Sequence, residues 1–170
     1  MPSLKVEKPS FRLEDAYLEM CNDYIKNNDQ EYTYRTIEEV RGKITSDQNY
    51  EIGKIPENRL QSYCYWFMLD NTIIGTSRLR PKLNERFMHV GGNIGYDVRP
   101  SYRRKGFGSE ILRLTVGEAK KIGMKKVLIT CNDDNIGSYK VIENNMGKLI
   151  DKEYDEVVGR KIRRYSLSII

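Results

Sequence analysis

The stretch "VRPSYRRKGFGSEILRL", residues 98–114, constrains the fold more than any other part of the chain. A strand-like apolar run stops at Pro100, a helix-like run begins near Ser109, and Gly106 and Gly108 lie between them. Proline is tolerated at the end of a strand but not inside a sheet, and glycines leave the backbone bare of side chains. The stretch therefore predicts a strand, a basic loop and a helix in direct succession.

The loop of this unit has the composition of an anion-binding site. The first backbone N–H groups of a helix point outward unpaired, and the helix dipole adds positive charge there. A phosphate can accept those N–H groups where glycines let it approach, and Arg103, Arg104 and Lys105 would attract it. The loop "RRKGFG" is thus typical of a pyrophosphate cradle, although on these six residues alone a solvated basic loop is an open alternative. It lacks the Lys-Ser or Lys-Thr of a Walker A loop and the third glycine of a dinucleotide fingerprint.

Positive charge is concentrated around this loop. The chain carries a net charge of +5, but residues 99–126 hold nine Lys or Arg against two Glu, which is +7 and leaves −2 for the rest. A nucleic-acid surface would spread its charge along a groove with interleaved aromatic residues. The local excess favours a compact anionic ligand, and we expect no nucleic-acid partner.

Length and composition indicate one soluble domain. A chain of 170 residues with 39% hydrophobic and 31% charged residues is ordinary for a globular protein. No apolar run approaches the roughly 20 residues that cross a bilayer, and the start lacks the apolar core of a signal peptide. We therefore expect a cytoplasmic protein without a membrane partner.

The cysteines and the histidine exclude several kinds of site. Cys21, Cys64 and Cys131 are too far apart for a zinc pair and fit buried free thiols. His89 is the only histidine, so a histidine-based metal site or a Ser/His/Asp triad has little support. The sequence predicts no metal.

Hydrophobic periodicity predicts an α/β fold. We expect helices at 13–25 and 36–44, the second begun by a capping box of Thr36 and Glu39, then a loop at 45–56. Strands are expected at 62–69 and 72–80 around an Asp-Asn turn, and at 89–98 after a polar connection; a helix at 109–122, a strand at 125–131, a helix at 135–146 and a hairpin about Gly159 follow. This order predicts a mixed, mostly antiparallel central sheet of about six to seven strands flanked by helices.

The motifs resemble those of the GNAT N-acetyltransferase superfamily. Its signature, Arg or Gln, two residues, Gly, one residue, then Gly or Ala, is met by Arg103, Gly106 and Gly108. "YDVRPSYRRKGFGSEIL", "KKVLITCNDDN" and "NIGSYKVIENNMGKL" are similar to the family's strand-turn-helix, next strand and later helix, so that the resemblance covers about 63–169. It implies one N-acetyltransferase domain over 1–170, with acceptor-side helices at about 10–60 and an acetyl-CoA-binding core at about 62–170.

This resemblance implies that the protein transfers the acetyl group of acetyl-CoA, its co-substrate, to a primary amine of a small molecule, amino acid or peptide by direct attack in a ternary complex. The backbone of Asp97 and Val98, together with Tyr96, would hold the pantetheine arm. Asn135 would contact the cofactor, or cap its helix, or do both. The pyrophosphate would bind at Arg103 and the amides of Arg104, Lys105, Gly106, Phe107, Gly108 and Ser109.

The match is weaker at the catalytic groups. The family often places a glutamate base on the strand before the signature, where this chain has Asn93, Gly95 and Asp97. Asp97 is the only carboxylate there and is the candidate base, directly or through a water; the alternative is a strand-end residue bonded to nearby N–H groups.

The family's tyrosine acid also lacks a counterpart. It would fall at Ile142, and Tyr139 lies about one helical turn earlier. Tyr139 is the candidate acid, the alternative being packing in the core or against substrate. His89 could serve as a remote base or be a surface residue.

Other interpretations remain beside an enzyme. A non-catalytic acyl-CoA-binding or regulatory module would keep the cradle without the acid and base. The aromatic residues around 32–34 and 63–66 could form either core or a cage for the amine, and the edge strands of the tail would permit a homodimer. The acceptor amine stays unidentified.

Overall fold

Helices and strands alternate along the chain much as the periodicity predicts. The computed structural model describes residues 3–169 and contains five helices and seven strands within that range. They are β1 (Lys5–Glu7), α1 (Glu14–Lys26), α2 (Ile37–Glu51), β2 (Tyr63–Leu69), β3 (Thr72–Leu79), α3 (Glu85–His89), β4 (Ile94–Val98), α4 (Phe107–Lys121), β5 (Lys126–Asn132), α5 (Ile136–Asn144), β6 (Lys148–Asp155) and β7 (Arg160–Ser168). Single turns of 3-10 helix, η1 (Phe11–Leu13) and η2 (Pro100–Tyr102), precede α1 and follow β4.

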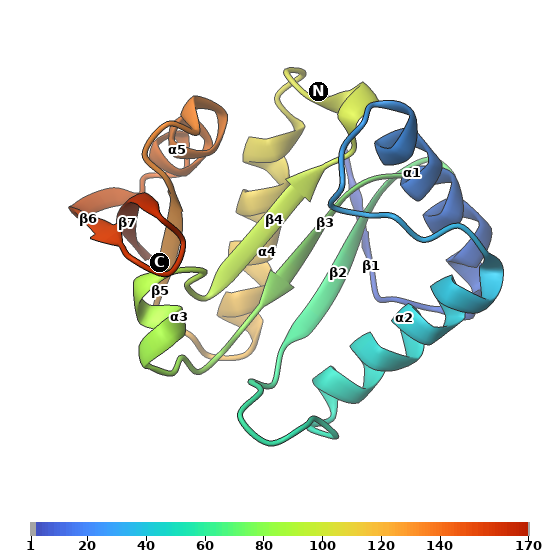
Figure 1. Cartoon of the computed structure of the whole chain (residues 1–170), viewed down its shortest axis with the longest axis horizontal. Coiled ribbons are helices and arrows are strands. Elements are labelled where there is room, and N and C mark those ends of the chain that lie inside the picture. Colours follow the sequence, from blue (N-terminus) through green and yellow to red (C-terminus); the bar gives the residue numbers. More distant parts are fainter. Residues whose placement is uncertain (1–2, 170) are drawn as a thin grey trace.

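The strands form two antiparallel sheets with the orders β1-β2-β3-β4 and β5-β7-β6. The predicted α/β class and the number of strands are confirmed, but the strands divide between β4 and β5 instead of forming one continuous sheet. Figure 1 shows α1 and α2 on one side of the four-stranded sheet and α4 on the other.

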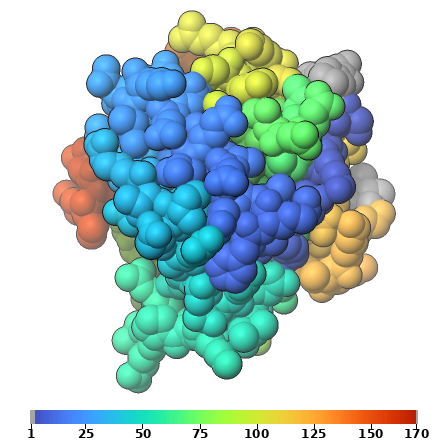
Figure 2. Space-filling model, turned by 90° about the vertical axis from the view of Figure 1, so that its right-hand side faces the viewer, coloured from blue at the N-terminus to red at the C-terminus, as the bar shows by residue number. Residues whose placement is uncertain are grey.

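Strand β2 is apolar throughout because both of its faces are buried. Cys64, Trp66 and Met68 belong to a cluster with α1 and α2, whereas Tyr65 and Phe67 belong to a cluster with α4. The space-filling view in Figure 2 shows the N-terminal helices, blue to cyan, spread over the first of these faces. The three cysteines are buried and free, as predicted.

Helix α2 continues seven residues beyond its predicted end, so the prediction of a loop at 45–51 is wrong. The capping box of Thr36 and Glu39 is present as predicted. The buried face runs through Val40 and Ile44 to Asp47, where a carboxylate stands at the next core position. The hydrophobic periodicity did not reveal this part of the helix, because the buried position 47 is occupied by a carboxylate. Asp47 forms ion pairs with Lys43 and Arg78 there.

The segment before β4 also differs from its prediction. The polar connection contains α3, whose first turn is capped by the Asn84 side chain accepting from the Phe87 amide at 3.0 Å. His89 ends this helix instead of starting a strand, and β4 begins only at Ile94. The predicted hairpin turns are confirmed, since Asp70 and Gly159 take positive φ values of 52° and 71° between their strands.

Asn93 joins the two sheets where β4 begins. Its side chain is 7% exposed, accepts from the Leu128 amide of β5 at 2.7 Å and donates to the Arg80 carbonyl at 2.8 Å. Its own amide donates to the Leu128 carbonyl at 2.7 Å. Beyond this junction β4 and β5 pair with other strands, so a gap opens between the two sheets.

Replacement of Asn93 by Leu is expected to lower the free energy of unfolding by about 2–4 kcal/mol. It leaves the Leu128 amide and the Arg80 carbonyl without their side-chain partner, and for such half-buried groups the cost is roughly 1–2 kcal/mol each. Urea denaturation measures this change. Asn144, exposed at the end of α5, supplies the control substitution Asn144→Leu, which should change stability by less than about 0.5 kcal/mol. A loss below about 1 kcal/mol for Asn93→Leu would show that the junction does not depend on this side chain.

Candidate functional site

Two cavities meet at β4. The helix-start cavity, about 520 Å³, lies between β4 and the N-terminal ends of α4 and α5, and Gly106, Gly108 and Asn135 line it. The aromatic cavity, about 350 Å³, lies between β2 to β4 and the N-terminal segments. Tyr96 and Asp97 line both cavities, so these two residues form the connection between them.

The pairing of β4 decides which of its backbone groups face the gap between the sheets. The backbone amide of Arg80 donates to the Asn93 carbonyl, and the backbone amide of Arg99 donates to the Ile74 carbonyl. The odd-numbered residues of β4 therefore form their backbone hydrogen bonds with β3. In an antiparallel ladder the alternate residues direct N–H and C=O the other way. Tyr96 and Val98 therefore face the gap.

Only Tyr96 keeps both of these backbone groups available. The Val98 amide donates to Oδ1 of the preceding residue, Asp97, at 2.7 Å, and the Val98 carbonyl accepts from Arg103 Nε at 2.8 Å. The Asp97 backbone faces β3. The expectation was that Asp97 and Val98, together with Tyr96, offer these backbone groups, and in the structure only Tyr96 has both available. Strand register sets the direction of these groups, and it depends on pairing that a single strand does not reveal.

The start of α4 has the backbone of an anion site. Gly106 is the N-cap with φ 85° and provides no side-chain cap. Within the described residues, the amides of 104–109 donate to no protein acceptor. The positive φ explains the glycine at 106. At 108 the reason is packing, because a Cβ there would lie 3.1 Å from Val141 Cγ2.

The side chains of the predicted basic cluster have different roles. Arg103 is held by protein carboxylates, at 2.8 Å from Asp29 and 3.2 Å from Asp97. Lys105 donates to the Ser101 carbonyl at 2.9 Å and lines neither cavity. Arg104, exposed at φ 60°, lines the helix-start cavity and forms no ion pair with another described residue. Arg104 is therefore the cation most available to an anion there.

Two further predicted residues of this site are explained by local structure. Phe107 is 6% exposed and packs edge-on against Tyr102, so only its amide faces outward. Asn135 caps α5 by accepting from the Ser138 amide at 3.0 Å, which leaves its amide nitrogen free toward the helix-start cavity. Ser109 also lines this cavity.

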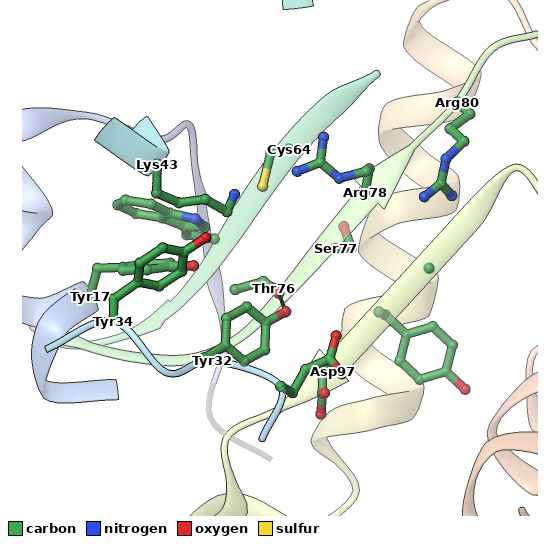
Figure 3. A pocket seen from close by; sticks show the side chains of 14 residues that line it. Tyr17, Tyr32, Tyr34, Lys43, Cys64, Thr76, Ser77, Arg78, Arg80 and Asp97 are labelled. Atoms are coloured by element: carbon green, nitrogen blue, oxygen red, sulfur yellow. Dashed lines mark hydrogen bonds between the residues drawn. The ribbon is translucent and has the colours of Figure 1, made fainter. Parts of the chain in front are cut away.

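Asp97 lies where the two cavities meet, with its side chain directed to the aromatic cavity (Figure 3). Burial is the strongest influence on its carboxyl and raises its pKa above the ordinary value, although Arg103 and the Val98 amide act in the opposite direction. Glu31 lines the same cavity, and burial together with the charge of Asp97 raises its pKa as well. This end of the cavity suits a cation and a proton acceptor.

The other candidate catalytic residues lie elsewhere. Tyr139 lines neither cavity, and its ring stacks beneath the Arg163 guanidinium of β7 at 3.9 Å. Ile142 is fully buried in the core. His89 is exposed at the end of α3, with Nδ1 3.7 Å from a Glu153 carboxylate oxygen. The structure therefore does not bring Tyr139 or His89 together with Asp97.

The sequence did not indicate that the hydroxyl of Tyr96, on β4, is a candidate proton donor. The Tyr96 hydroxyl donates to the Ser138 carbonyl at 3.3 Å and lies 3.2 Å from Ser138 Oγ, and Ser138 lines the helix-start cavity in the first turn of α5. Burial raises the pKa of Tyr96 to about 12. Tyr96 thus places a hydroxyl and a free amide beside the same gap.

The basic residues of the aromatic cavity were also missed. Arg78 of β3 and Arg80, directly after β3, lie at alternate positions on the same face as Thr76. Tyr32 contributes a wall of this cavity and its hydroxyl lies 2.7 Å from Thr76 Oγ1, as drawn in Figure 3. Charged residues at alternate positions of a buried strand were the available signal, since such residues are rarely buried without a partner. The predicted aromatic residues divide between the two roles. Tyr32, Tyr34 and Trp66 line the cavity, whereas Tyr63 and Tyr65 pack in the cluster with α4.

No metal-binding group of three or more His, Cys, Asp or Glu occurs within the part of the chain that the structure describes. None of the described helices is long and apolar enough to span a bilayer.

Two cavities that meet at one carboxylate suit an enzyme that transfers a group from one substrate to another. The fold and the site together define the class of acyltransferases. Residues 10–146 match the family model described as "Acetyltransferase (GNAT) domain", so the chain belongs to that family. No curated protein sequence matches the chain significantly.

Solved structures share the fold at low sequence identity. A ribosomal L7/L12 alpha-N-protein acetyltransferase, RimL, in complex with coenzyme A is similar with a TM-score of 0.72 and 16% identity, covering 99% of this chain and 96% of that one. The microcin C7 self-immunity acetyltransferase MccE in complex with acetyl-CoA and AMP gives 0.75 and 14%, covering 99% and 94%. A ribosomal-protein-S5-alanine acetyltransferase from Vibrio fischeri gives 0.70 and 14%, covering 98% and 93%.

Proposed function

We propose that the protein transfers the acetyl group of acetyl-CoA to a primary amine by direct attack in a ternary complex. The observation that carries this proposal is the position of Asp97, a half-buried carboxylate lining both cavities. The similar RimL and MccE structures hold coenzyme A and acetyl-CoA, which supports the choice of co-substrate.

Acetyl-CoA occupies the helix-start cavity in this proposal. Its pyrophosphate accepts hydrogen bonds from the free amides of 104–109, and the Arg104 guanidinium adds a charge-assisted hydrogen bond. The pantetheine arm follows the gap along β4. There the Tyr96 amide, which faces the gap, donates to the thioester oxygen as negative charge develops on it.

The amine enters the aromatic cavity and approaches the same point from the other side of β4. Asp97 accepts a proton from the ammonium group, and the neutral nitrogen then bonds to the acetyl carbon while the carbon–sulfur bond breaks. Tyr96 donates its hydroxyl proton to the leaving thiolate and recovers the proton that the nitrogen loses. The products are the N-acetylated amine and free coenzyme A.

Two conservative substitutions test the assignment of the acid. Tyr96→Phe is expected to lower kcat about 10-fold or more, because the thiolate loses its donor. Tyr139→Phe removes the same atom from a ring that lines neither cavity, so kcat should stay within about twofold. Steady-state thiol release measures both, and the opposite order of effects would move the acid to Tyr139.

The alternative of a non-catalytic acyl-CoA-binding module is separated by two measurements. Calorimetry determines whether acetyl-CoA binds, and a thiol-release screen over amines determines whether the bound acetyl group moves. Binding without release for every amine would leave the module interpretation in place of the enzyme.

A further inference from the structure

Arg80 is a half-buried cation of the aromatic cavity that has no carboxylate partner among residues 3–169. Its side chain contacts the Phe87 ring, 4.4 Å from the guanidinium carbon, and the Gly92 carbonyl, 3.4 Å from Nη1. Burial, with a smaller effect of Arg78, lowers the pKa of Arg80 to about 10, which leaves it charged at neutral pH. A buried charge is normally paired, because its desolvation is otherwise uncompensated.

The other two cations at this end of the cavity, Lys43 and Arg78, leave the net charge there positive. Arg78 Nη2 lies 2.6 Å from Asp47 Oδ1, and Lys43 pairs with the other oxygen of the same carboxylate. Lys43 and Arg78 therefore share the single carboxylate of Asp47, and Arg80 stands beside them without contacting it. This end of the cavity keeps a positive charge directed at its interior.

The opposite end of the cavity is acidic, and the separation of the two ends is set by the sheet. Thr76 pairs with Asp97 and Arg78 pairs with Gly95, so these positions form successive rows of one face. The Arg80 guanidinium folds back over the second row, since a Cβ on Gly95 would lie 4.0 Å from Arg80 Nη1. Two residues along a strand correspond to roughly 7 Å, so this is the span between the acidic row and the guanidinium.

Figure 3 shows Asp97 at one end of the cavity and Arg78 with Arg80 at the other. Glycine at 95 leaves the floor between them open. The walls between the ends are aromatic, from Tyr32, Tyr34 and Trp66. A ligand that fits this arrangement has a cationic end, a short linker and an anionic end.

We propose that the acceptor is a small amine that carries a carboxylate or phosphate roughly 7 Å from its nitrogen, and that Arg80 determines this specificity by binding the anionic group. The proposal rests on the acetyltransferase function proposed above, which supplies the role of the amine end. Arginine suits the anion because its planar fork donates two parallel hydrogen bonds to a carboxylate or phosphate.

Matched pairs of probes test the proposal by calorimetry with coenzyme A present. The pairs are 5-aminopentanoate with 5-aminopentanamide, 3-aminopropyl phosphate with 3-aminopropanol, and the dipeptide α-amides of serylglutamate and serylglutamine, which differ only in the charge of the second side chain. For the small amines the wild type should bind the anionic member about 10-fold or more tightly than the neutral one. Arg80→Gln should abolish that difference, and Arg80→Lys should retain part of it.

The control variant is Arg86→Gln. Arg86 is exposed on α3, pairs with Asp155 at 2.7 Å and lines neither cavity, so its loss should leave the preference unchanged. Equal binding of anionic and neutral members by the wild type would overturn the proposal, as would an equal loss for both members in Arg80→Gln. A preference confined to the dipeptides would overturn the small-molecule assignment and indicate a peptide acceptor.

Failure of the proposed function gives a different result. If the acetyltransferase proposal alone is wrong, the anionic probes still bind in an Arg80-dependent manner, but none of them releases coenzyme A from acetyl-CoA. Thiol release with each probe is therefore measured beside the binding.

Discussion

Asp97→Asn is expected to lower kcat by about 10²–10⁴-fold while acetyl-CoA binding changes by less than about twofold. The asparagine keeps the size of the side chain but cannot accept the proton of the amine. The cofactor contacts proposed above use the amides of 104–109 and of Tyr96, which the substitution leaves in place. Thiol-release kinetics and calorimetry measure the two quantities.

The pH dependence gives a second readout of the same variant. In the wild type kcat should fall as pH decreases through the raised pKa of Asp97, because the protonated carboxyl no longer accepts a proton. The folded chain binds this proton more tightly than the unfolded chain does. Stability therefore decreases as pH rises from the ordinary pKa to the raised one, and Asp97→Asn should be no less stable than the wild type at neutral pH.

Asp29→Asn is the matched control for this experiment. Asp29 shares the Arg103 guanidinium with Asp97, at 2.8 Å, but lines neither cavity. It therefore reports the effect of losing an ion pair to Arg103 without loss of the base. Equal kcat values for wild type and Asp97→Asn with a good acceptor would refute Asp97 as the base.

Gly106→Glu is expected to raise the Kd for acetyl-CoA about 100-fold or more. The substitution places a carboxylate at the helix start, where like-charge repulsion of the pyrophosphate costs several kcal/mol, roughly 2.7 kcal/mol being enough for 100-fold. Calorimetry measures the Kd. Gly106→Asn should lie between wild type and Gly106→Glu, since asparagine tolerates positive φ and adds no charge.

The end of the same helix provides the control. Gly123 has φ 83°, close to the 85° of Gly106, and a Cβ there meets nothing within 4 Å. Gly123→Glu therefore introduces the same charge and the same backbone strain far from the cradle. If both variants weaken acetyl-CoA binding equally, strain in α4 and not the phosphate contact explains the loss.

The strand, glycine loop and helix around 98–114 were predictable because each step depends on local chemistry. The strand ends before Pro100, Gly106 is the N-cap of α4, and the apolar period of α4 follows directly. The helix begins at Phe107, two residues before its predicted start, so Gly108 belongs to the helix and not to the loop. Membership of the family rests on the same local pattern. The predicted capping box of Thr36 and Glu39 is likewise confirmed because it involves one helical turn.

Features that depend on distant partners were not predictable. The helical continuation to Glu51 includes the buried Asp47, whose ion pair with Arg78 of β3 joins residues 31 positions apart in the sequence. The direction of the β4 backbone follows from its register with β3. Tyr139 satisfied a spacing argument, but the position of Arg163 over its ring is a property of the packed fold.

Gly106 and Gly108 have structural reasons that the sequence did not reveal. The sequence suggested that both residues stand aside for a phosphate. In the structure Gly106 supplies a left-handed turn, and Gly108 lets α4 approach Val141 of α5. Each glycine is therefore required by the fold even before a ligand binds.

The connection of the two cavities at Tyr96 and Asp97 alone gives the enzyme a modular design. Apart from this pair, the walls of the aromatic cavity come from residues 17–95, and those of the helix-start cavity come from residues 98–141. Mutations in the first segment can alter the aromatic cavity without touching the residues proposed above to hold acetyl-CoA. Selection for a new acceptor in such a chain therefore acts on one half of the sequence while the donor half is inherited intact.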